Sequence, residues 1–157
     1  MNLDFTIKGK VIAKQSMKIG RYGIKYTPRE VKDYASLVQK SFLAKYPMWT
    51  YKYYDDVGLR VYISVYKSIP KSYSKKKTKE ASVNYIRPTS KPDCDNIAKS
   101  ICDALNGLAY PDDRQIVSLT VNKYYTECED SVRVVIESVI MDETDQKILG
   151  VGDYYGK

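Results

Sequence analysis

The sequence predicts a mixed α/β (α+β) fold in which about four strands and two main helices follow one another in the order β-α-β-α-β-β. Two patterns predict it: apolar residues that alternate with polar ones, as in half-buried strands, and apolar residues three or four positions apart, as in amphipathic helices. Their succession favours a mixed sheet with helices packed on it. Because 157 residues suffice for one core, we expect one domain over 1–140 and an acidic C-terminal tail over 141–157.

The first half of the chain contains a strand, a basic loop and a helix. Alternation predicts the strand over 3–8, and a basic, glycine-containing loop follows over 13–26. Thr27-Pro28 is expected to form the N-cap and first residue of the helix, and Glu30 to complete a capping box. The helix should run to about Lys45. Its apolar face consists of residues at helical spacing: Val31, Tyr34, Ala35, Val38 and Phe42.

The second half predicts one helix among three strands. The strands follow from alternation and lie over 59–66, 117–121 and 132–136. The helix runs from Asp93–Asp95 to Asn106-Gly107, where an Asn-Gly pair is a natural C-terminal cap. A lysine-rich run over 71–79 is too polar to bury and fits either a loop or a short exposed helix. The last two strands are expected to form a hairpin through the acidic loop 126–130.

The composition excludes several kinds of site. The chain has no histidine, which excludes a histidine general base and a histidine-ligated zinc ion. Its three cysteines, Cys94, Cys102 and Cys128, follow no zinc-ligand spacing and suit free thiols in a reducing compartment. The first residues lack the pattern of a signal peptide, and no apolar run reaches the roughly 18 residues of a membrane span. We therefore expect a cytoplasmic protein that does not contact a membrane.

The charge is uneven along the chain. The net charge is +7, yet residues 1–126 carry 23 Lys or Arg against 11 Asp or Glu, whereas residues 127–157 carry 3 against 8. A basic body attracts polyanions, because binding releases the counterions condensed on them. Nucleic acid is therefore the partner that the charge favours, although surface lysines that serve only solubility give the same count.

Acidic residues at two places suggest a site for a hard metal ion. Asp93 and Asp95 lie at the predicted start of the second helix, and Lys99 lies one turn beyond Asp95 on the same face. Asp112-Asp113 follows on a turn that can come back toward the first pair. Carboxylate oxygens suit Mg²⁺ or Mn²⁺, and a helix N-terminus offsets only part of the repulsion between neighbouring carboxylates. On spacing alone, a helix cap and an ordinary turn explain the same residues.

Longer stretches of the sequence resemble the RusA family of Holliday junction resolvases. Three blocks match the family pattern: Asp93-Cys94-Asp95-Asn96-Ile97-Ala98-Lys99, Asp103-Ala104-Leu105-Asn106-Gly107 and Asp112-Asp113-Arg114-Gln115-Ile116-Val117. Shorter matches are Gly9-Lys10-Val11, Tyr26-Thr27-Pro28 and Ile86-Arg87-Pro88-Thr89. The resemblance covers roughly residues 3–137.

The resemblance implies a homodimeric endodeoxyribonuclease that resolves four-way DNA junctions by paired symmetric nicks in recombination and repair. It also implies Mg²⁺ as cofactor, with Mn²⁺ able to substitute. Carried over by position, Asp93, Asp95 and Asp113 are expected to be catalytic and to bind the metal. Asp112 is expected as a further ligand, and Lys99 as the essential lysine.

Asp103 also fits the family pattern, but its place two turns beyond Asp95 favours a structural role. Basic residues near the aspartates and in the two basic runs are the expected DNA contacts: Lys14, Lys18, Arg21, Lys75, Lys76, Lys77, Arg87 and Lys91. Tyr22, Tyr26 and Tyr73 are candidates for stacking on bases. Solvated loops that need charge only for solubility explain the same residues.

Two alternative functions stay open at this point. A non-catalytic DNA-binding module would use the basic surface alone and would not need aspartates near phosphates. A related metal nuclease would act on flaps or on RNA. Cleavage of a four-way junction with and without Mg²⁺ distinguishes the junction resolvase from the binding module. Comparing cleavage of junction, flap, duplex and RNA substrates distinguishes it from the related nuclease.

Overall fold

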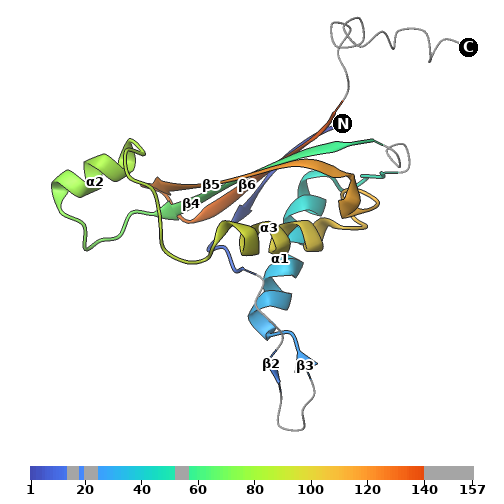
Figure 1. Ribbon diagram of the computed structural model, residues 1–157, viewed down its shortest axis with the longest axis horizontal. Helices are drawn as coiled ribbons and strands as arrows, with labels where there is room; N and C mark the ends of the chain where they lie inside the picture. The colour runs from blue at the N-terminus through green and yellow to red at the C-terminus, as the bar shows by residue number, and fades with distance from the viewer. Residues whose placement is uncertain (14–17, 20–24, 52–56, 140–157) are drawn as a thin grey trace, which may run out of the picture.

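A four-stranded mixed sheet and three α-helices organise the residues that the computed structural model describes, which are 1–13, 18–19, 25–51 and 57–139. In chain order the elements are β1 (Asn2–Lys8), β2 (Lys18–Ile19), β3 (Lys25–Tyr26), α1 (Arg29–Lys45), β4 (Leu59–Ser68), α2 (Lys75–Ser82), α3 (Cys94–Leu105), the 3₁₀ helix η1 (Asp113–Gln115), β5 (Ile116–Thr126) and β6 (Ser131–Ser138). The predicted mixed sheet and α+β class are confirmed (Figure 1). The lysine-rich run forms the short helix α2, so the main order is β-α-β-α-α-β-β.

The sheet has the strand order β1-β6-β4-β5 and contains both pairing directions. β4 pairs in parallel with β5 and antiparallel with β6, which pairs antiparallel with β1. The inward side chains are buried and follow the predicted alternation: Leu3, Phe5, Ile7, Leu59, Val61, Ile63, Val65, Val132, Val134 and Ile136. Parallel pairing of β4 with β5 requires a crossover connection. The segment that contains α2 and α3 supplies it, which brings α3 against the sheet.

The predicted hairpin between the last two strands is wrong. β5 and β6 are not neighbours, because β4 lies between them. The short loop after Thr126 passes the end of β4, where the backbone amide and the hydroxyl of Ser68 both donate hydrogen bonds to Asp130. β5 is therefore an edge strand of eleven residues, and its Val117 and Leu119 are exposed.

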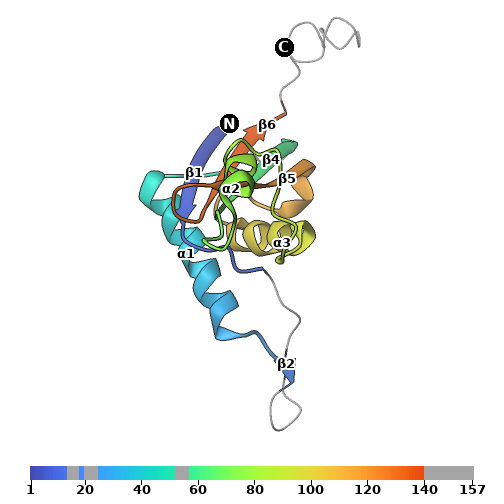
Figure 2. The same ribbon diagram turned by 90° about the vertical axis from the view of Figure 1, so that its left-hand side faces the viewer.

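Helices α1 and α3 pack on the same face of the sheet and on each other (Figures 1 and 2). The predicted apolar face of α1 is confirmed, with Val31, Tyr34, Val38 and Phe42 buried and Ala35 partly buried. Phe42 stands edge-on to Phe5 of β1, with ring centroids 5.4 Å apart. α3 buries Ile97, Ile101 and Leu105 in the same core, so its orientation on the sheet is set by packing.

Helix α1 begins one residue later than predicted. Its first residue is Arg29, and the amides of Val31 and Lys32 donate to the carbonyl of Pro28, which is the N-cap. No side chain caps this end, so the expected capping box of Thr27 and Glu30 does not form. The reason is that proline occupies the cap position, and its ring has no acceptor for a helix amide.

The end of α3 agrees with the prediction and leads directly into the second group of acidic residues. Asn106 is the C-cap, and Gly107 has a φ of +70°, a left-handed conformation that favours glycine. The buried hydroxyl of Tyr110 donates to the carbonyl of Cys102 at 3.1 Å, and the indole of Trp49 donates to the carbonyl of Ala109 at 2.9 Å. These bonds fix the turn before η1 to the core.

None of the helices among the described residues is long and apolar enough to span a membrane. The expected acidic tail over 141–157 lies outside the described residues.

Candidate functional site

The N-terminus of α3 presents two aspartates to solvent. Asp93 occupies the N-cap position and Asp95 lies in the first turn, and both side chains are exposed. Asp93 makes no side-chain hydrogen bond to the helix amides, although aspartate in this position commonly makes one. Two carboxylates this close repel each other, and the helix N-terminus compensates only part of that repulsion. A bound cation would compensate the rest.

The exposed side of α3 continues this acidic end as a row of alternating charge. Asp95, Lys99 and Asp103 are spaced four residues apart, so they lie along one side of the helix, and all three are exposed. The Lys99 ammonium therefore lies between two acidic positions.

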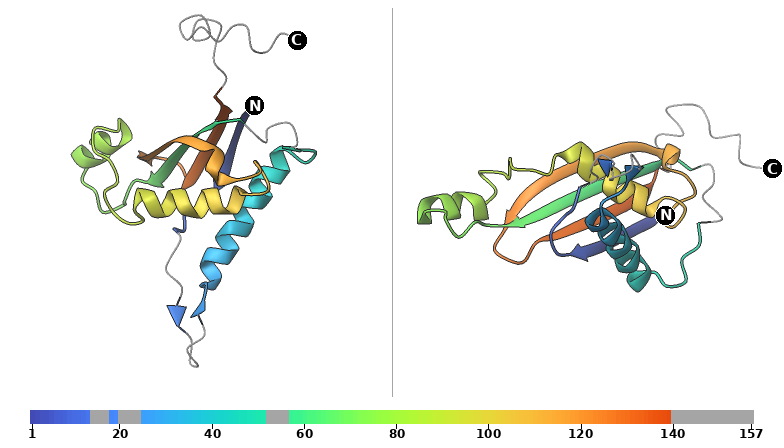
Figure 3. Two further views of the ribbon diagram at one scale, coloured as in Figure 1. Left: turned by 45° about the vertical axis from the view of Figure 1, so that its right-hand side comes forward. Right: turned by 90° about the horizontal axis from the view of Figure 1, so that it is seen from below.

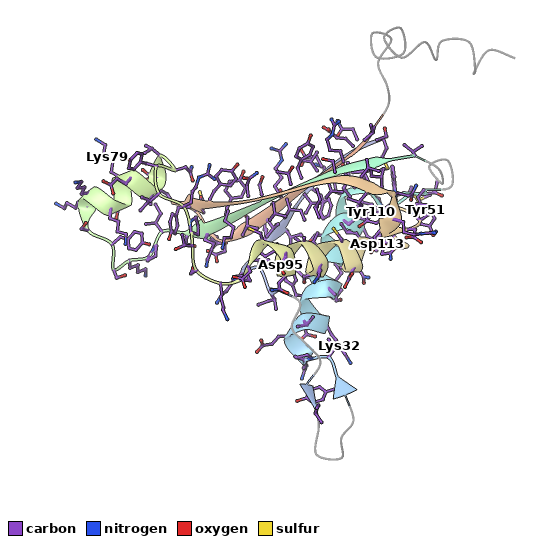
Figure 4. All side chains as sticks on the ribbon, viewed as in Figure 1. Lys32, Tyr51, Lys79, Asp95, Tyr110 and Asp113 are labelled. Atoms are coloured by element: carbon purple, nitrogen blue, oxygen red, sulfur yellow. The ribbon has the colours of Figure 1, made fainter. Side chains whose placement is uncertain are left out.

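Asp113 lies beside the second half of α3 rather than at its start. It is the first residue of η1, and it lines a pocket of about 260 Å³ together with Lys99, Cys102 and Asp103. Leu119 of β5 also lines this pocket. Figure 4 shows the labelled side chains of Asp95 and Asp113 toward opposite ends of α3. The structure thus brings Asp113 together with Lys99 and Asp103.

Within one chain, the described residues do not gather the three aspartates expected to share a metal ion. No three acidic or cysteine side chains among them lie close enough together to hold one. Asp95 and Asp103 are eight residues apart, which is roughly 12 Å along the helix axis, and Asp113 lies near Asp103. Carboxylates that bind one Mg²⁺ place their oxygens about 2 Å from it. The described residues of a single chain therefore do not assemble a site from Asp93, Asp95 and Asp113 together.

Asp112 is already engaged in local bonds. Its carboxylate accepts a hydrogen bond from the backbone amide of Arg114 at 2.9 Å and pairs with the Arg114 guanidinium at 2.9 Å. Together with Gln115 it forms the capping box of η1. The amide hydrogen bond and the guanidinium hold the pKa of Asp112 below its ordinary value. A metal ion at Asp112 would have to compete with these bonds.

Lys67 and Lys123, which sequence reasoning missed, hold the loop that leads into Asp93. Both donate hydrogen bonds to residues 90–92. A signal for them was present in the sequence. Each lysine occupies the next inward position of its strand, after Val65 in β4 and Val121 in β5, where the alternation calls for an apolar residue.

Helix α2 carries three of the expected DNA-contact lysines beyond one end of the sheet (Figure 3). Lys75, Lys76 and Lys77 are exposed, and Ser74 caps the helix by accepting from the amide of Lys77 at 3.3 Å. The Lys77 ammonium lies 4.0 Å from the ring centre of Tyr73. The hydroxyl of Tyr73 is 2.9 Å from that of Tyr125. Tyr73, expected as a candidate for base stacking, therefore already contacts two side chains of its own chain.

The other expected DNA contacts differ in how far the structure describes them. Arg87 lies 4.0 Å over the ring of Tyr124 and donates to the carbonyl of Lys123 at 3.1 Å, so it helps to anchor its loop. Lys91 is exposed next to the aspartates, and Tyr26 is 48% exposed. The remaining predictions lie outside the described residues or concern side chains that are not described: Lys14, Lys18, Arg21 and Tyr22.

Comparison with known proteins supports the resemblance drawn from the motifs. A family model described as "Endodeoxyribonuclease RusA" matches residues 8–137, which is more than half of the chain. The "Uncharacterized protein YqaN" of Bacillus subtilis (strain 168) is 49% identical over 79 residues, which are 49% of this chain and 55% of that protein. The chain thus spans about half the length of this curated relative. The family match includes both α3 and η1 with all their aspartates.

Proposed function

The chain belongs to the RusA family of endodeoxyribonucleases, and we propose that it is a metal-dependent nuclease that resolves four-way DNA junctions by paired symmetric nicks. One observation carries the proposal beyond the family match: Asp93 lies at the start of α3, exposed and without a capping bond, and the nearby Asp95 is also exposed. A protein that only binds DNA gains nothing from unpaired carboxylates beside a phosphate backbone, because they repel it.

Mg²⁺ is the proposed cofactor, with Mn²⁺ able to substitute, because the candidate ligands are hard carboxylate oxygens. Asp93, Asp95 and Asp113 are the proposed ligands, and Asp112 can join them only by giving up its capping bonds. When bound, the metal supplies activation of water and neutralisation of a phosphate oxygen. The Lys99 ammonium stabilises the charge that develops on the phosphate or protonates the leaving oxygen.

The proposal includes a homodimer in which each metal site is completed by two chains. Within one chain Asp113 lies near Asp103, away from Asp93. Val117 and Leu119 are 65% and 46% exposed on the edge strand β5, and Leu119 lines the pocket that contains Asp113. A second copy would therefore find apolar side chains to cover there. Two-fold symmetry would place one site on each of two opposed strands of the junction.

The basic residues are the proposed contacts to the DNA arms of the junction. Helix α2, which carries three exposed lysines, lies beyond one end of the sheet, and Lys91 adds charge next to the aspartates. Lys14, Lys18 and Arg21 of the basic segment 13–26 are proposed as further DNA contacts, and Arg87 contributes beside its anchoring role. The cysteines are free thiols among the described residues, which fits action in the cytoplasm: Cys94, Cys102 and Cys128.

A synthetic four-way junction tests this function directly. Incubation with Mg²⁺ is expected to give nicks at symmetric positions on two opposed strands, and incubation with EDTA is expected to give none. Flap, duplex and RNA substrates in the same assay show whether the junction is preferred. Tight binding without cleavage in either Mg²⁺ or Mn²⁺ would favour the binding module, and faster cleavage of flaps or RNA would favour the related nuclease.

The lysines of α2 allow a separate prediction for DNA binding. Simultaneous replacement of Lys75, Lys76 and Lys77 by Gln should weaken junction binding and flatten its salt dependence, because each phosphate contact releases about one counterion. We expect the slope of log affinity against log salt to fall by about one for each lysine that contacts a phosphate. The measurement is junction affinity as a function of salt concentration, in Ca²⁺ or EDTA. Lys40→Gln, which removes an exposed lysine of α1, is the control. An unchanged slope would remove α2 from the DNA interface.

A further inference from the structure

Two lysines point inward from neighbouring strands, where the fold otherwise buries apolar side chains. Lys67 continues the inward series that ends with Val65 in β4, and Lys123 lies opposite Val65 in β5. The two strands are paired in parallel, so these lysines are diagonal neighbours on one face of the sheet. This is the face that α3 covers.

Both ammonium groups bind the same short segment of chain. Lys123 Nζ donates to the carbonyls of Ser90 and Pro92, at 3.0 and 3.1 Å. Lys67 Nζ donates to the hydroxyl of Ser90 at 2.9 Å and to the carbonyl of Lys91 at 3.1 Å. Three consecutive carbonyls, from residues 90 to 92, are therefore held by two cations, and the next residue is Asp93.

This arrangement is costly for the fold. Partial burial and the nearby charge of Lys123 lower the pKa of Lys67, whereas Asp130 acts in the opposite direction. Two like charges side by side beneath the loop of residues 90–92 do not serve packing, since apolar residues would fill the same positions without repulsion. What the lysines provide instead is a set of charge-assisted hydrogen bonds to one loop, and such bonds are stronger than neutral ones.

We propose that Lys67 and Lys123 are positioning residues for the metal site: they hold residues 90–92 so that Asp93 and Asp95 are presented in a fixed geometry at the start of α3. This inference rests on the proposed nuclease function. The segment directly before Asp93, residues 89–92, has one basic residue, Lys91. The charge beside it comes from the strands, and it points at the loop backbone.

The test measures metal binding rather than cleavage alone. Mn²⁺ binding, followed by the electron paramagnetic resonance signal of the free ion, is expected to weaken about tenfold or more in Lys123→Met, in the range that loss of a residue supporting metal ligands produces. Nicking should require correspondingly more metal, with a smaller loss at saturating metal. Lys123→Arg should restore much of the affinity, because a guanidinium can donate to the same two carbonyls.

Lys40→Met, which removes a lysine from the exposed side of α1, is the matched control and should leave Mn²⁺ affinity unchanged. Lys67→Met is a second variant, expected to weaken Mn²⁺ binding in the same direction, and it serves if Lys123→Met does not fold. Folded Lys67→Met and Lys123→Met proteins with wild-type Mn²⁺ affinity would overturn the proposal. So would a drop in junction affinity with unchanged Mn²⁺ binding, which would make the lysines DNA contacts.

Asp93→Asn separates this inference from the function on which it rests. If Asp93→Asn weakens Mn²⁺ binding and Lys123→Met does not, the metal site stands and the positioning role is rejected. If Asp93→Asn itself leaves Mn²⁺ affinity unchanged, the proposed metal site is wrong and the positioning role is rejected together with it.

Discussion

Asp93→Asn and Asp113→Asn should each reduce junction nicking by about 10³-fold or more while leaving junction binding intact. A divalent ion contributes several kcal/mol to stabilisation of a phosphoryl transition state, and each 1.36 kcal/mol corresponds to a factor of about ten in rate. Asparagine keeps the size of the side chain but removes the charge that binds the ion. Both residues are exposed, and Asp93 makes no capping bond, so neither substitution should disturb the fold.

The measurement is single-turnover nicking of a four-way junction, together with a binding titration in Ca²⁺. Junction affinity should be equal or slightly higher in both variants, because a negative charge near the phosphates has been removed. Asp33→Asn is the matched control, since Asp33 is an exposed aspartate of α1 that pairs with Arg29 across one helical turn. Either variant retaining wild-type nicking at saturating Mg²⁺ would remove that aspartate from the catalytic set.

Local patterns predicted the elements of this fold well, because helices and strands show their own periodicity. The inward series of β4 and the buried side of α1 follow from spacing alone. The pairing of strands could not be predicted in this way, because it joins segments that are far apart in the sequence. A short acidic loop between β5 and β6 is typical of a hairpin, yet Ser68 at the end of β4 donates to Asp130 of that loop, and β4 lies between the two strands. Nothing in the spacing of 117–136 reveals the strand in between.

In the candidate site, too, the sequence predicts the residues that are close in the chain but not those that the fold brings together. Asp93 and Asp95 are two residues apart, so their proximity follows from sequence, as does the position of Lys99 one turn later. The place of Asp113 depends on how the chain returns after α3. It returns alongside the helix to the pocket with Asp103, not to the first turn. Sequence spacing gives no distance across such a return, and it gives none across a dimer interface.

A metal site shared between two chains and a metal site built within one chain lead to opposite predictions for mixed dimers. Co-expression with two affinity tags yields dimers of an Asp93→Asn chain with an Asp113→Asn chain. If each site takes Asp93 and Asp95 from one chain and Asp113 from the other, one site in this dimer carries both substitutions and its second site is intact. Such dimers should regain about half of the wild-type rate of the first nick, although either parent alone is inactive. They should accumulate singly nicked junctions, since only one strand can be cut.

The reciprocal dimer is the control, and it combines a wild-type chain with a chain that carries both substitutions. If the sites are shared, each of the two sites in this dimer carries one substitution, and nicking should be lost. If each site is built within one chain, the site of the wild-type copy is intact and stays active. A dimer of Asp93→Asn with Asp95→Asn should be inactive under either arrangement when Asp93 and Asp95 act from the same helix. Because α3 places Asp113 beside Asp103 and away from its own first turn, the shared arrangement is the expected result. Activity of the reciprocal dimer together with inactivity of the first would refute it.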